Sequence, residues 1–142
     1  MSVAVGRALV TGRVDRIEVS PDGRVRIVDL KTGAGKPTAA EVRRHGQLGA
    51  YQLAVEHGAF AEHGTRSGGA ALLQLGRAAG ARTTLQLQQP LESDDDPGWA
   101  RDLVEEVSAG MGGAVFPATP GPACGTCQLK DSCPAHAEGR RL

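Results

Sequence analysis

The chain has 142 residues, a length that suits one domain able to bury roughly 68% of its unfolded surface. Its 16 basic and 16 acidic residues give a formal net charge of zero, which is mild evidence against a protein that binds DNA unaided. It has no apolar run of about 18 residues, no signal-peptide pattern and only three cysteines, so we expect a cytoplasmic protein without a membrane span or a disulfide framework.

Two strands are predicted at the start of the chain. Residues 3–19 are rich in valine and interrupted by glycine, which indicates one bent strand or two short ones. The sequence SPDG then predicts a tight turn, because proline fixes one dihedral angle and glycine accepts a positive one. A strand over 24–31 completes a hairpin, with Asp15 ending the first strand and Asp29 near the end of the second. Lys31 shares a face with Asp29 through the two-residue period of a strand.

A helix is predicted after a flexible loop at 32–37. Thr38 and Glu41 form a T-x-x-E capping box, which opens a helix that should run to about Glu56. Strand-forming residues around a polar turn then predict two more strands, and an acidic first turn predicts a second helix. These three elements cover residues 70–75, 83–91 and 93–110.

The elements follow in the order strand–strand–helix–strand–strand–helix, before a segment rich in proline, glycine and cysteine. This order indicates an α/β fold in which helices flank a mixed β-sheet. We therefore expect a core over 1–117 and a cysteine-rich tail over 118–142.

The two strand aspartates and the lysine form a candidate site. Cross-strand neighbours have Cβ atoms about 5 Å apart, so Asp15 and Asp29 would repel each other unless a cation lay between them. Mg²⁺ accepts such carboxylates together with waters and a backbone carbonyl, here that of Leu30. Lys31 would reach a phosphate oxygen, and the set would suit hydrolysis of a phosphodiester. The alternative is a minor salt bridge among exposed strand residues.

Three stretches of the chain resemble the RecB-like branch of the PD-(D/E)xK nucleases: GRVDRIE, VRIVDLKTG and QLGAYQLA. The resemblance implies a restriction-endonuclease-like fold in which Asp15 and Asp29 are metal-binding acids and Lys31 is the catalytic lysine. It also implies that Gln47 and Tyr51 form the helix motif that lines the site. We expect Gln47 to be a site residue and Tyr51 to serve mainly in packing.

The same resemblance implies a function. It predicts a deoxyribonuclease dependent on Mg²⁺ or Mn²⁺, fused to or paired with a helicase that feeds it DNA. Such helicase–nucleases process double-strand breaks in recombinational repair. The alternative is a nuclease-like remnant without catalytic activity, acting as a structural or DNA-binding module.

Three cysteines lie close together near the end of the sequence, in a C-x2-C-x5-C pattern at Cys124, Cys127 and Cys133. Thiolates at this spacing suit soft metals and iron–sulfur clusters. The tail resembles that of RecB-like nucleases of the AddB and AdnA/AdnB type, which implies a [4Fe–4S] cluster whose fourth cysteine lies upstream. No cysteine precedes Cys124 here, so Zn²⁺ completed by His136 is an alternative.

The resemblance also implies a leading helix with a histidine and a glutamate before the first catalytic strand. Because no such helix precedes the strands, we expect the chain to be the C-terminal part of a larger polypeptide. A fragmentary gene, a truncated chain and a degenerate copy all remain open.

Other polar residues are expected to be structural. His45 is interpreted as a solvated helix residue, and Glu18 as a surface residue on the strand face opposite Asp15. The acidic run at 94–96 could suggest a second metal cluster, but a solvated loop capping the following helix is favoured.

Overall fold

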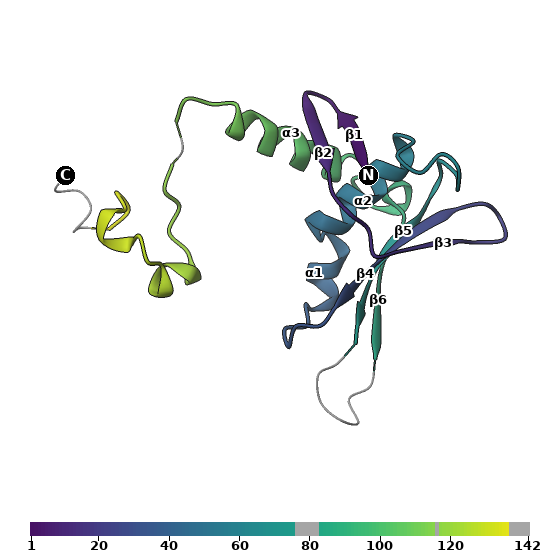
Figure 1. The fold of residues 1–142 in the computed structure, drawn as a ribbon, viewed down its shortest axis with the longest axis horizontal. Coiled ribbons are helices and arrows are strands. Elements are labelled where there is room, and N and C mark those ends of the chain that lie inside the picture. Colours follow the sequence, from purple (N-terminus) through teal and green to yellow (C-terminus); the bar gives the residue numbers. More distant parts are fainter. Residues whose placement is uncertain (76–82, 116, 137–142) are drawn as a thin grey trace. The chain divides into compact units, whose positions relative to one another are not determined.

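The computed structural model describes residues 1–75, 83–115 and 117–136 (Figure 1). It divides into two compact units, Met1–Ser108 and Ala109–Leu142, which are described separately below. All strands of the described part, and most of its helical residues, belong to the first unit.

The first unit contains a four-stranded mixed sheet. Its strand order is β3-β4-β5-β6, with β4 and β5 parallel and the two outer pairings antiparallel. A separate antiparallel hairpin, β1-β2, precedes it in the chain. The described strands are β1 Ser2–Val5, β2 Ala8–Thr11, β3 Arg16–Val19, β4 Val25–Lys31, β5 Ser67–Gln74 and β6 Thr84–Gln88.

The segment 3–19 holds more strands than predicted. Instead of one bent strand or two short ones, it contributes to β1, β2 and β3. Gly6 has a φ of 56°, in the left-handed region that glycine tolerates, and it turns the chain back between β1 and β2. Asp15 therefore does not end a strand, as predicted, but lies immediately before β3.

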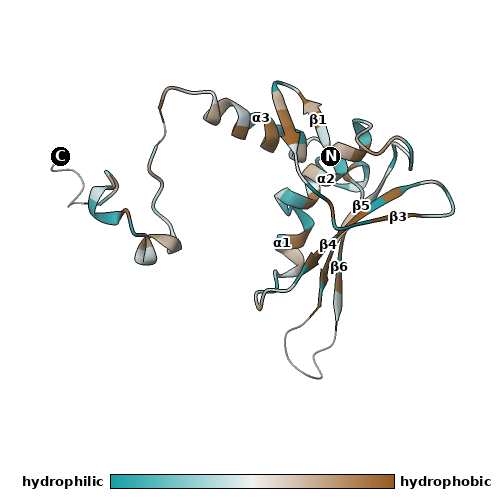
Figure 2. Ribbon diagram, viewed as in Figure 1, coloured by the Kyte–Doolittle hydropathy of each residue, from teal (hydrophilic) through white to brown (hydrophobic). Residues whose placement is uncertain are grey.

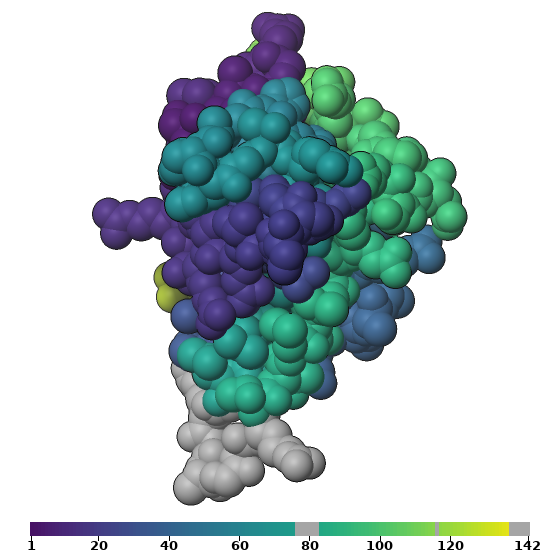
Figure 3. Space-filling model, turned by 90° about the vertical axis from the view of Figure 1, so that its right-hand side faces the viewer, coloured from purple at the N-terminus to yellow at the C-terminus, as the bar shows by residue number. Residues whose placement is uncertain are grey.

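The predicted hairpin over the SPDG turn is confirmed. β3 and β4 pair with Arg16 opposite Val28, and Gly23 takes a φ of 77° in the turn. The Arg24 guanidinium donates a hydrogen bond to the Ser67 carbonyl oxygen at 3.2 Å, which ties the hairpin to the start of β5. Figure 3 shows this hairpin in violet at the surface, beside the teal residues that lead into β5.

The helix predicted over 38–56 is two helices, α1 Ala39–Arg43 and α2 Gly46–Glu56. Its predicted start is correct. Thr38 and Glu41 form the capping box, with hydrogen bonds from the Thr38 N–H to Glu41 Oε2 at 2.7 Å and from the Glu41 N–H to Thr38 Oγ1 at 3.3 Å. The hydrogen bonds that the Glu41 carboxylate accepts from the Thr38 N–H and the Thr38 hydroxyl hold its pKa below the usual value.

A buried side chain from β6 explains the break at Arg44 and His45. Gln88 is 3% exposed and lies under the junction between the two helices. Its Nε2 donates to backbone carbonyl oxygens that a continuous helix would use internally. The acceptors are those of Val42, Arg43 and His45, at 2.9, 3.3 and 3.3 Å.

The core lies between the sheet and α2. It includes side chains of low exposure from both layers, among them Ile27, Leu48, Val55 and Leu72. Figure 2 shows hydrophobic residues along β4, the strand that carries Ile27. Paired residues on neighbouring strands share a face, and Gln88 and Asp29 both contact the α1–α2 segment, so α1 and α2 cover the same face of the sheet.

The last predicted helix starts later than expected. Within 93–110 the sequence predicts helix throughout, but a 3₁₀ turn at Leu91–Ser93 comes first and α3 spans Trp99–Met111. The intervening loop is held by Asp94, whose carboxylate accepts hydrogen bonds from the backbone N–H two residues later and from Arg44. These bonds favour a turn over helical backbone.

The second unit has little internal packing. Between residues 109 and 136 no described residue is buried. Its regular structure is the last turn of α3 and two short 3₁₀ turns, η2 Pro122–Thr126 and η3 Lys130–Ser132. In the part of the chain that the structure describes, no helix has the length and apolar character needed to cross a membrane.

Candidate active site

Asp29 is a buried carboxylate near the end of β4, at the edge where the parallel strands β4 and β5 both end. Val25 and Ile27 occupy the preceding positions of the same strand face and are fully buried in the core. Because side chains alternate along a strand, this pattern carries Asp29 and then Lys31 onto the face that α2 covers. The apolar half of β4 thus fixes where its polar residues point.

Three side chains surround the Asp29 carboxylate. Oδ1 accepts hydrogen bonds from Gln47 Nε2 at 2.8 Å and from the Tyr51 hydroxyl at 3.1 Å. Oδ2 lies 2.8 Å from Lys31 Nζ in an ion pair. Burying a carboxylate is costly unless charge and hydrogen bonds compensate, which these neighbours do. We call Asp29, Lys31, Gln47 and Tyr51 the Asp29 cluster.

Gln47 links the other members of the cluster. It lies four residues before Tyr51, so the two side chains are neighbours on one face of α2. Its Nε2 donates to the Tyr51 oxygen at 2.8 Å, and its Oε1 accepts from Lys31 Nζ at 2.9 Å. The lysine ammonium is therefore held between Asp29 and Gln47.

Tyr51 does more than pack. It is 6% exposed, and burial raises the pKa of its hydroxyl above the ordinary value. The negative charges of Asp29 and Asp15 also raise this pKa. At neutral pH Tyr51 therefore keeps its proton and donates to Asp29.

Asp15 lies beside the cluster. Extending the β3–β4 register by one residue sets Asp15 opposite Asp29. Asp15 is exposed, and its Oδ2 accepts a hydrogen bond from the Leu30 N–H at 2.8 Å. The three residues predicted as metal ligands are thus neighbours in the hairpin, but Asp15 contacts the Leu30 N–H and not the carbonyl oxygen predicted as a ligand.

A family model of the PD-(D/E)XK nuclease superfamily matches residues 1–134. The chain belongs to this superfamily. Its mixed sheet with flanking helices agrees with the predicted restriction-endonuclease-like fold, and its cysteines lie near the C-terminus. Members of the superfamily are generally nucleases and typically use divalent metals such as Mg²⁺. The comparison with curated proteins found no match.

The residues present fit a divalent cation of the kind this superfamily uses. Asp29 Oδ2 is a buried oxygen that contacts the Lys31 ammonium at 2.8 Å, and a carboxylate oxygen with one such contact keeps a further lone pair for a metal. Asp15 is exposed and adjacent. In the described residues, however, no group of three or more His, Cys, Asp or Glu side chains is placed to hold a metal ion. Two carboxylates would need a backbone carbonyl and waters to complete the shell.

The predicted metal site of the tail is not assembled in the described structure. Cys124 lies in η2, Cys127 directly follows it and Cys133 directly follows η3, all as free thiols. In the described residues, which include these cysteines and His136, no group of three or more His, Cys, Asp or Glu side chains is placed to hold a metal ion. Local bonds shape the segment, such as that from the His136 N–H to the Cys133 carbonyl oxygen at 2.9 Å. No buried contact gathers the thiols, since none of the described tail residues is buried.

The other polar residues singled out from the sequence lie outside the cluster. His45 is not within a helix but at the N-cap of α2, and its Nδ1 is buried without a hydrogen-bond partner among the described residues. Glu18 pairs with Arg16 at 2.8 Å on the surface.

The acidic run does not stand alone in solvent. The Asp94 carboxylate accepts from Arg44 at 2.8 Å, while Asp95 lies 3.9 Å from Arg43. The backbone N–H of Asp96 and the Arg44 guanidinium lower the pKa of Asp94. These ion pairs join the loop to α1, so they explain the acidic run without a metal.

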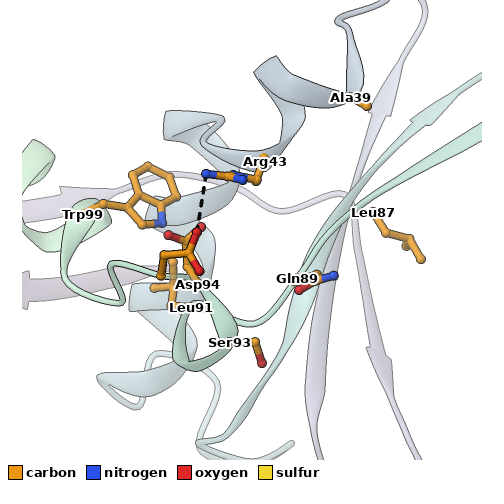
Figure 4. Close-up of a pocket in the computed structure, with 9 residues that line it drawn as sticks. Ala39, Arg43, Leu87, Gln89, Leu91, Ser93, Asp94 and Trp99 are labelled. Carbon is orange, nitrogen blue, oxygen red and sulfur yellow. Dashed lines mark ion pairs between the residues drawn. The ribbon is translucent and has the colours of Figure 1, made fainter.

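A cavity of about 310 Å³ lies beside this loop, and Figure 4 shows Arg43 and Trp99 on its wall, with the ion pair of Arg43 dashed. The cavity is bounded by α1, β6 and the residues before α3. The residues of the Asp29 cluster are not among those that line it. The cavity is therefore separate from the candidate active site.

One polar residue beside the cluster was not identified from the sequence. Gln74 ends β5, is 8% exposed and pairs in register with Lys31. Its signal in the sequence is a glutamine inside an otherwise apolar strand. That signal alone does not reveal the neighbouring strand, which depends on the parallel pairing of β4 with β5.

Proposed function

We propose that the chain is the catalytic domain of a metal-dependent DNA nuclease that hydrolyses phosphodiester bonds. The observation that carries this proposal is the Asp29 cluster, in which a buried carboxylate, a lysine and a helix glutamine are linked at a strand end. A purely structural salt bridge does not require this arrangement. Membership of the nuclease superfamily supports the same proposal.

Asp15, Asp29 and the Leu30 backbone carbonyl are the proposed ligands of Mg²⁺ or Mn²⁺. When bound, the ion supplies Lewis-acid catalysis and makes water more acidic. The hydrogen bonds from Gln47 and Tyr51 go to Asp29 Oδ1, so Oδ2, which lies 2.8 Å from Lys31 Nζ, is the oxygen proposed to bind the ion. The protein thereby fixes its main ligand before any substrate arrives.

Lys31 is the proposed charge-stabilising group. Its ammonium is shared between Asp29 and the Gln47 carbonyl oxygen, so one of its donors can turn toward a phosphate without losing the others. Negative charge that builds up on the phosphate during attack by water is offset there. Gln47 acts as the residue that orients Lys31, and Tyr51 as a residue that orients Asp29.

The setting we propose is a RecB-like helicase–nuclease of the AddB and AdnA/AdnB type in the cytoplasm, acting in recombinational repair of double-strand breaks. The resemblance of the VDLKTG and QLGAY stretches to that family supports this setting. A helicase partner would deliver DNA to the domain, which has zero net charge and so little general attraction for DNA. A catalytically inactive module is the second candidate. It is favoured by the absence, among the described residues, of any group of three or more His, Cys, Asp or Glu side chains placed to hold a metal ion.

For the tail, at 118–142 after a core at 1–117, we propose a [4Fe–4S] cluster held by Cys124, Cys127 and Cys133 with a cysteine from elsewhere. Zinc with His136 as fourth ligand is the alternative. Anaerobic purification followed by iron and zinc analysis separates them. Four irons with broad absorbance near roughly 400 nm support the cluster. Stoichiometric zinc that disappears in His136→Ala supports zinc instead.

The nuclease proposal is tested with labelled single-stranded DNA, Mg²⁺ or EDTA, and two lysine variants. Wild-type protein should cut the DNA with Mg²⁺ and not with EDTA. Lys31→Ala should lower kcat by about 10²–10³-fold, the usual effect of removing one group that stabilises transition-state charge. Lys36→Ala removes the same charge from an exposed position of the next loop and should change kcat little. Wild-type rates in Lys31→Ala would contradict the assignment.

A further inference from the structure

Gln74 lies next to Lys31 but takes no part in the contacts described above. The two residues are partners in the parallel register of β4 and β5, and each is the last residue of its strand. Partners on neighbouring strands point to the same face of the sheet. Gln74 therefore stands on the face that carries the Asp29 cluster, one strand away from Lys31.

The carboxamide of Gln74 is buried yet incompletely bonded. The residue is 8% exposed, and its Nε2 has no hydrogen-bond partner among the described residues. Buried amide groups are nearly always hydrogen-bonded, because leaving a donor unpaired is unfavourable. An unpaired donor beside a candidate site is therefore available to an acceptor that arrives with a ligand.

A second glutamine extends the same polar surface. Gln86 pairs with Leu72, which in turn pairs with Asp29, so Gln86 shares the Asp29 face on the outer strand. Its Nε2 donates to the Pro37 carbonyl oxygen at 2.7 Å, while its Oε1 is buried without a partner in the described chain. The Nε2 donor of Gln86 is thus already hydrogen-bonded, whereas the Nε2 donor of Gln74 has no partner among the described residues. Of the two glutamines, Gln74 is therefore the one that can donate to a ligand.

We propose that Gln74 is a phosphate-binding residue, which donates a hydrogen bond from Nε2 to a non-bridging oxygen of the nucleic-acid phosphate held beside Lys31. The inference rests on the proposed nuclease function. Phosphate oxygens accept hydrogen bonds and do not donate them, which matches the unpaired donor. Gln74 and Lys31 then hold one phosphate from two adjacent strands, and Gln74 contributes to binding rather than to the charge that develops during reaction.

The test compares Gln74→Met and Gln74→Glu with Gln89→Met, which makes the same change at an exposed residue just beyond β6. Two quantities are measured for a short single-stranded oligonucleotide: kcat and KM with Mg²⁺, and Kd by fluorescence anisotropy in EDTA, where cleavage stops. Gln74→Met should raise KM and Kd about fivefold, the effect of one lost hydrogen bond, with kcat within about twofold. Gln89→Met should match wild type.

Gln74→Glu distinguishes phosphate binding from a structural role. Its carboxylate has nearly the same shape but repels the phosphate, so it should weaken binding by more than about tenfold, and less at high salt. Unchanged Kd values in both variants would overturn the proposal. So would equal weakening in both, accompanied by equal falls in Tm, because a structural residue would behave in that way.

The binding measurement also separates this proposal from the nuclease proposal. If wild-type protein cuts no DNA but binds it, and Gln74→Met weakens that binding, the nuclease activity is contradicted and the role of Gln74 is supported. If wild-type protein cuts DNA and Gln74→Met leaves KM and Kd unchanged, the nuclease activity is supported and the role of Gln74 is contradicted. A wild-type protein that does not bind the oligonucleotide contradicts the role of Gln74.

Discussion

The Asp29 cluster and the cysteine segment, residues 117–136, both gather polar residues at short spacings, but only the first is organised by packing. Asp29 lies in a strand whose preceding inward residues are fully buried, and its partners come from a helix packed on that strand. In the described cysteine segment no residue is buried, and the thiols do not form a metal-holding group.

The difference shows two ways in which a sequence can specify a site. In the sheet unit, strand register and helix packing fix the donor atoms, so a ligand would find them already arranged. In the cysteine segment, only turns set the local geometry, so a metal would have to gather the thiolates itself. Variants should therefore have large effects in the first region and small effects in the metal-free second region.

The largest effect is expected from Asp29→Asn. This change keeps the shape of the side chain but removes the charge proposed to hold the metal and to balance Lys31. We expect kcat for DNA cleavage to fall by about 10³-fold or more, since both charge stabilisation and metal binding are affected. Glu18→Gln, which neutralises a surface acid of the same hairpin, is the control and should cut normally. A variant that retains about a tenth of wild-type kcat would contradict the assignment of Asp29 to the active site.

A glycine pair compares the packing of the two regions directly. A Cβ at Gly49 would lie 2.5 Å from Trp99 Cη2 and 3.0 Å from the Ala100 Cβ, whereas a Cβ at Gly125 meets no described atom within 4 Å. Gly49→Ala should lower the free energy of unfolding by about 1–3 kcal/mol through overpacking. Gly125→Ala should change it by less than about 0.5 kcal/mol. Urea unfolding measures both free energies, and equal effects would contradict the claim that the first region is packed and the second is not.

Tyr51→Phe tests the hydrogen bond to Asp29 through its dependence on pH. Because burial raises the pKa of Tyr51 above 10.0, the stability it contributes is fully present below pH 10 and is lost as the pH rises through the higher folded-state pKa. At about pH 9 the variant should be less stable than wild type by about 1 kcal/mol. The difference in free energy of unfolding should become smaller at more alkaline pH, because only the wild type loses the stability contributed by the protonated hydroxyl.

Tyr51 is the chain's single tyrosine, so tyrosinate absorbance reports its ionisation without interference. Titration of native protein should show ionisation only above the ordinary tyrosine range. Ionisation at the pH typical of an exposed tyrosine would mean that the hydroxyl is not buried beside Asp29.

The smallest effect is expected from Cys124→Ser in metal-free protein. Cys124 is partly exposed, and its sulfur accepts one local hydrogen bond, from the Gly121 N–H at 3.2 Å. The free energy of unfolding should change by less than about 0.5 kcal/mol. A clear loss of stability would show that the cysteine segment is packed after all.

Short-range patterns predicted most of the candidate site. The two-residue period of a strand placed Asp29 and Lys31 on one face, and four-residue spacing on a helix placed Gln47 beside Tyr51. Both relations depend only on residues near in sequence. The capping box at Thr38 was predictable for the same reason.

Features that depend on distant residues were missed. At the break between α1 and α2, Gln88, which is more than 40 residues away, donates to backbone carbonyls of the helix junction. The loop that precedes α3 is held in part by the hydrogen bond from Arg44 to Asp94. The position of Gln74 beside Lys31 depends on which strand pairs with β4. Local propensity contains none of this information.

The most direct test of the account is Mn²⁺ binding, followed by electron paramagnetic resonance, in wild type, Asp15→Asn, Asp29→Asn and Lys31→Ala. Mn²⁺ reports binding independently of cleavage. We predict a site in wild type that is lost in both aspartate variants and kept in Lys31→Ala, because lysine is proposed to act on the phosphate rather than on the metal. Aspartate variants that bind Mn²⁺ as wild type does would contradict the claim that Asp15 and Asp29 form the metal centre.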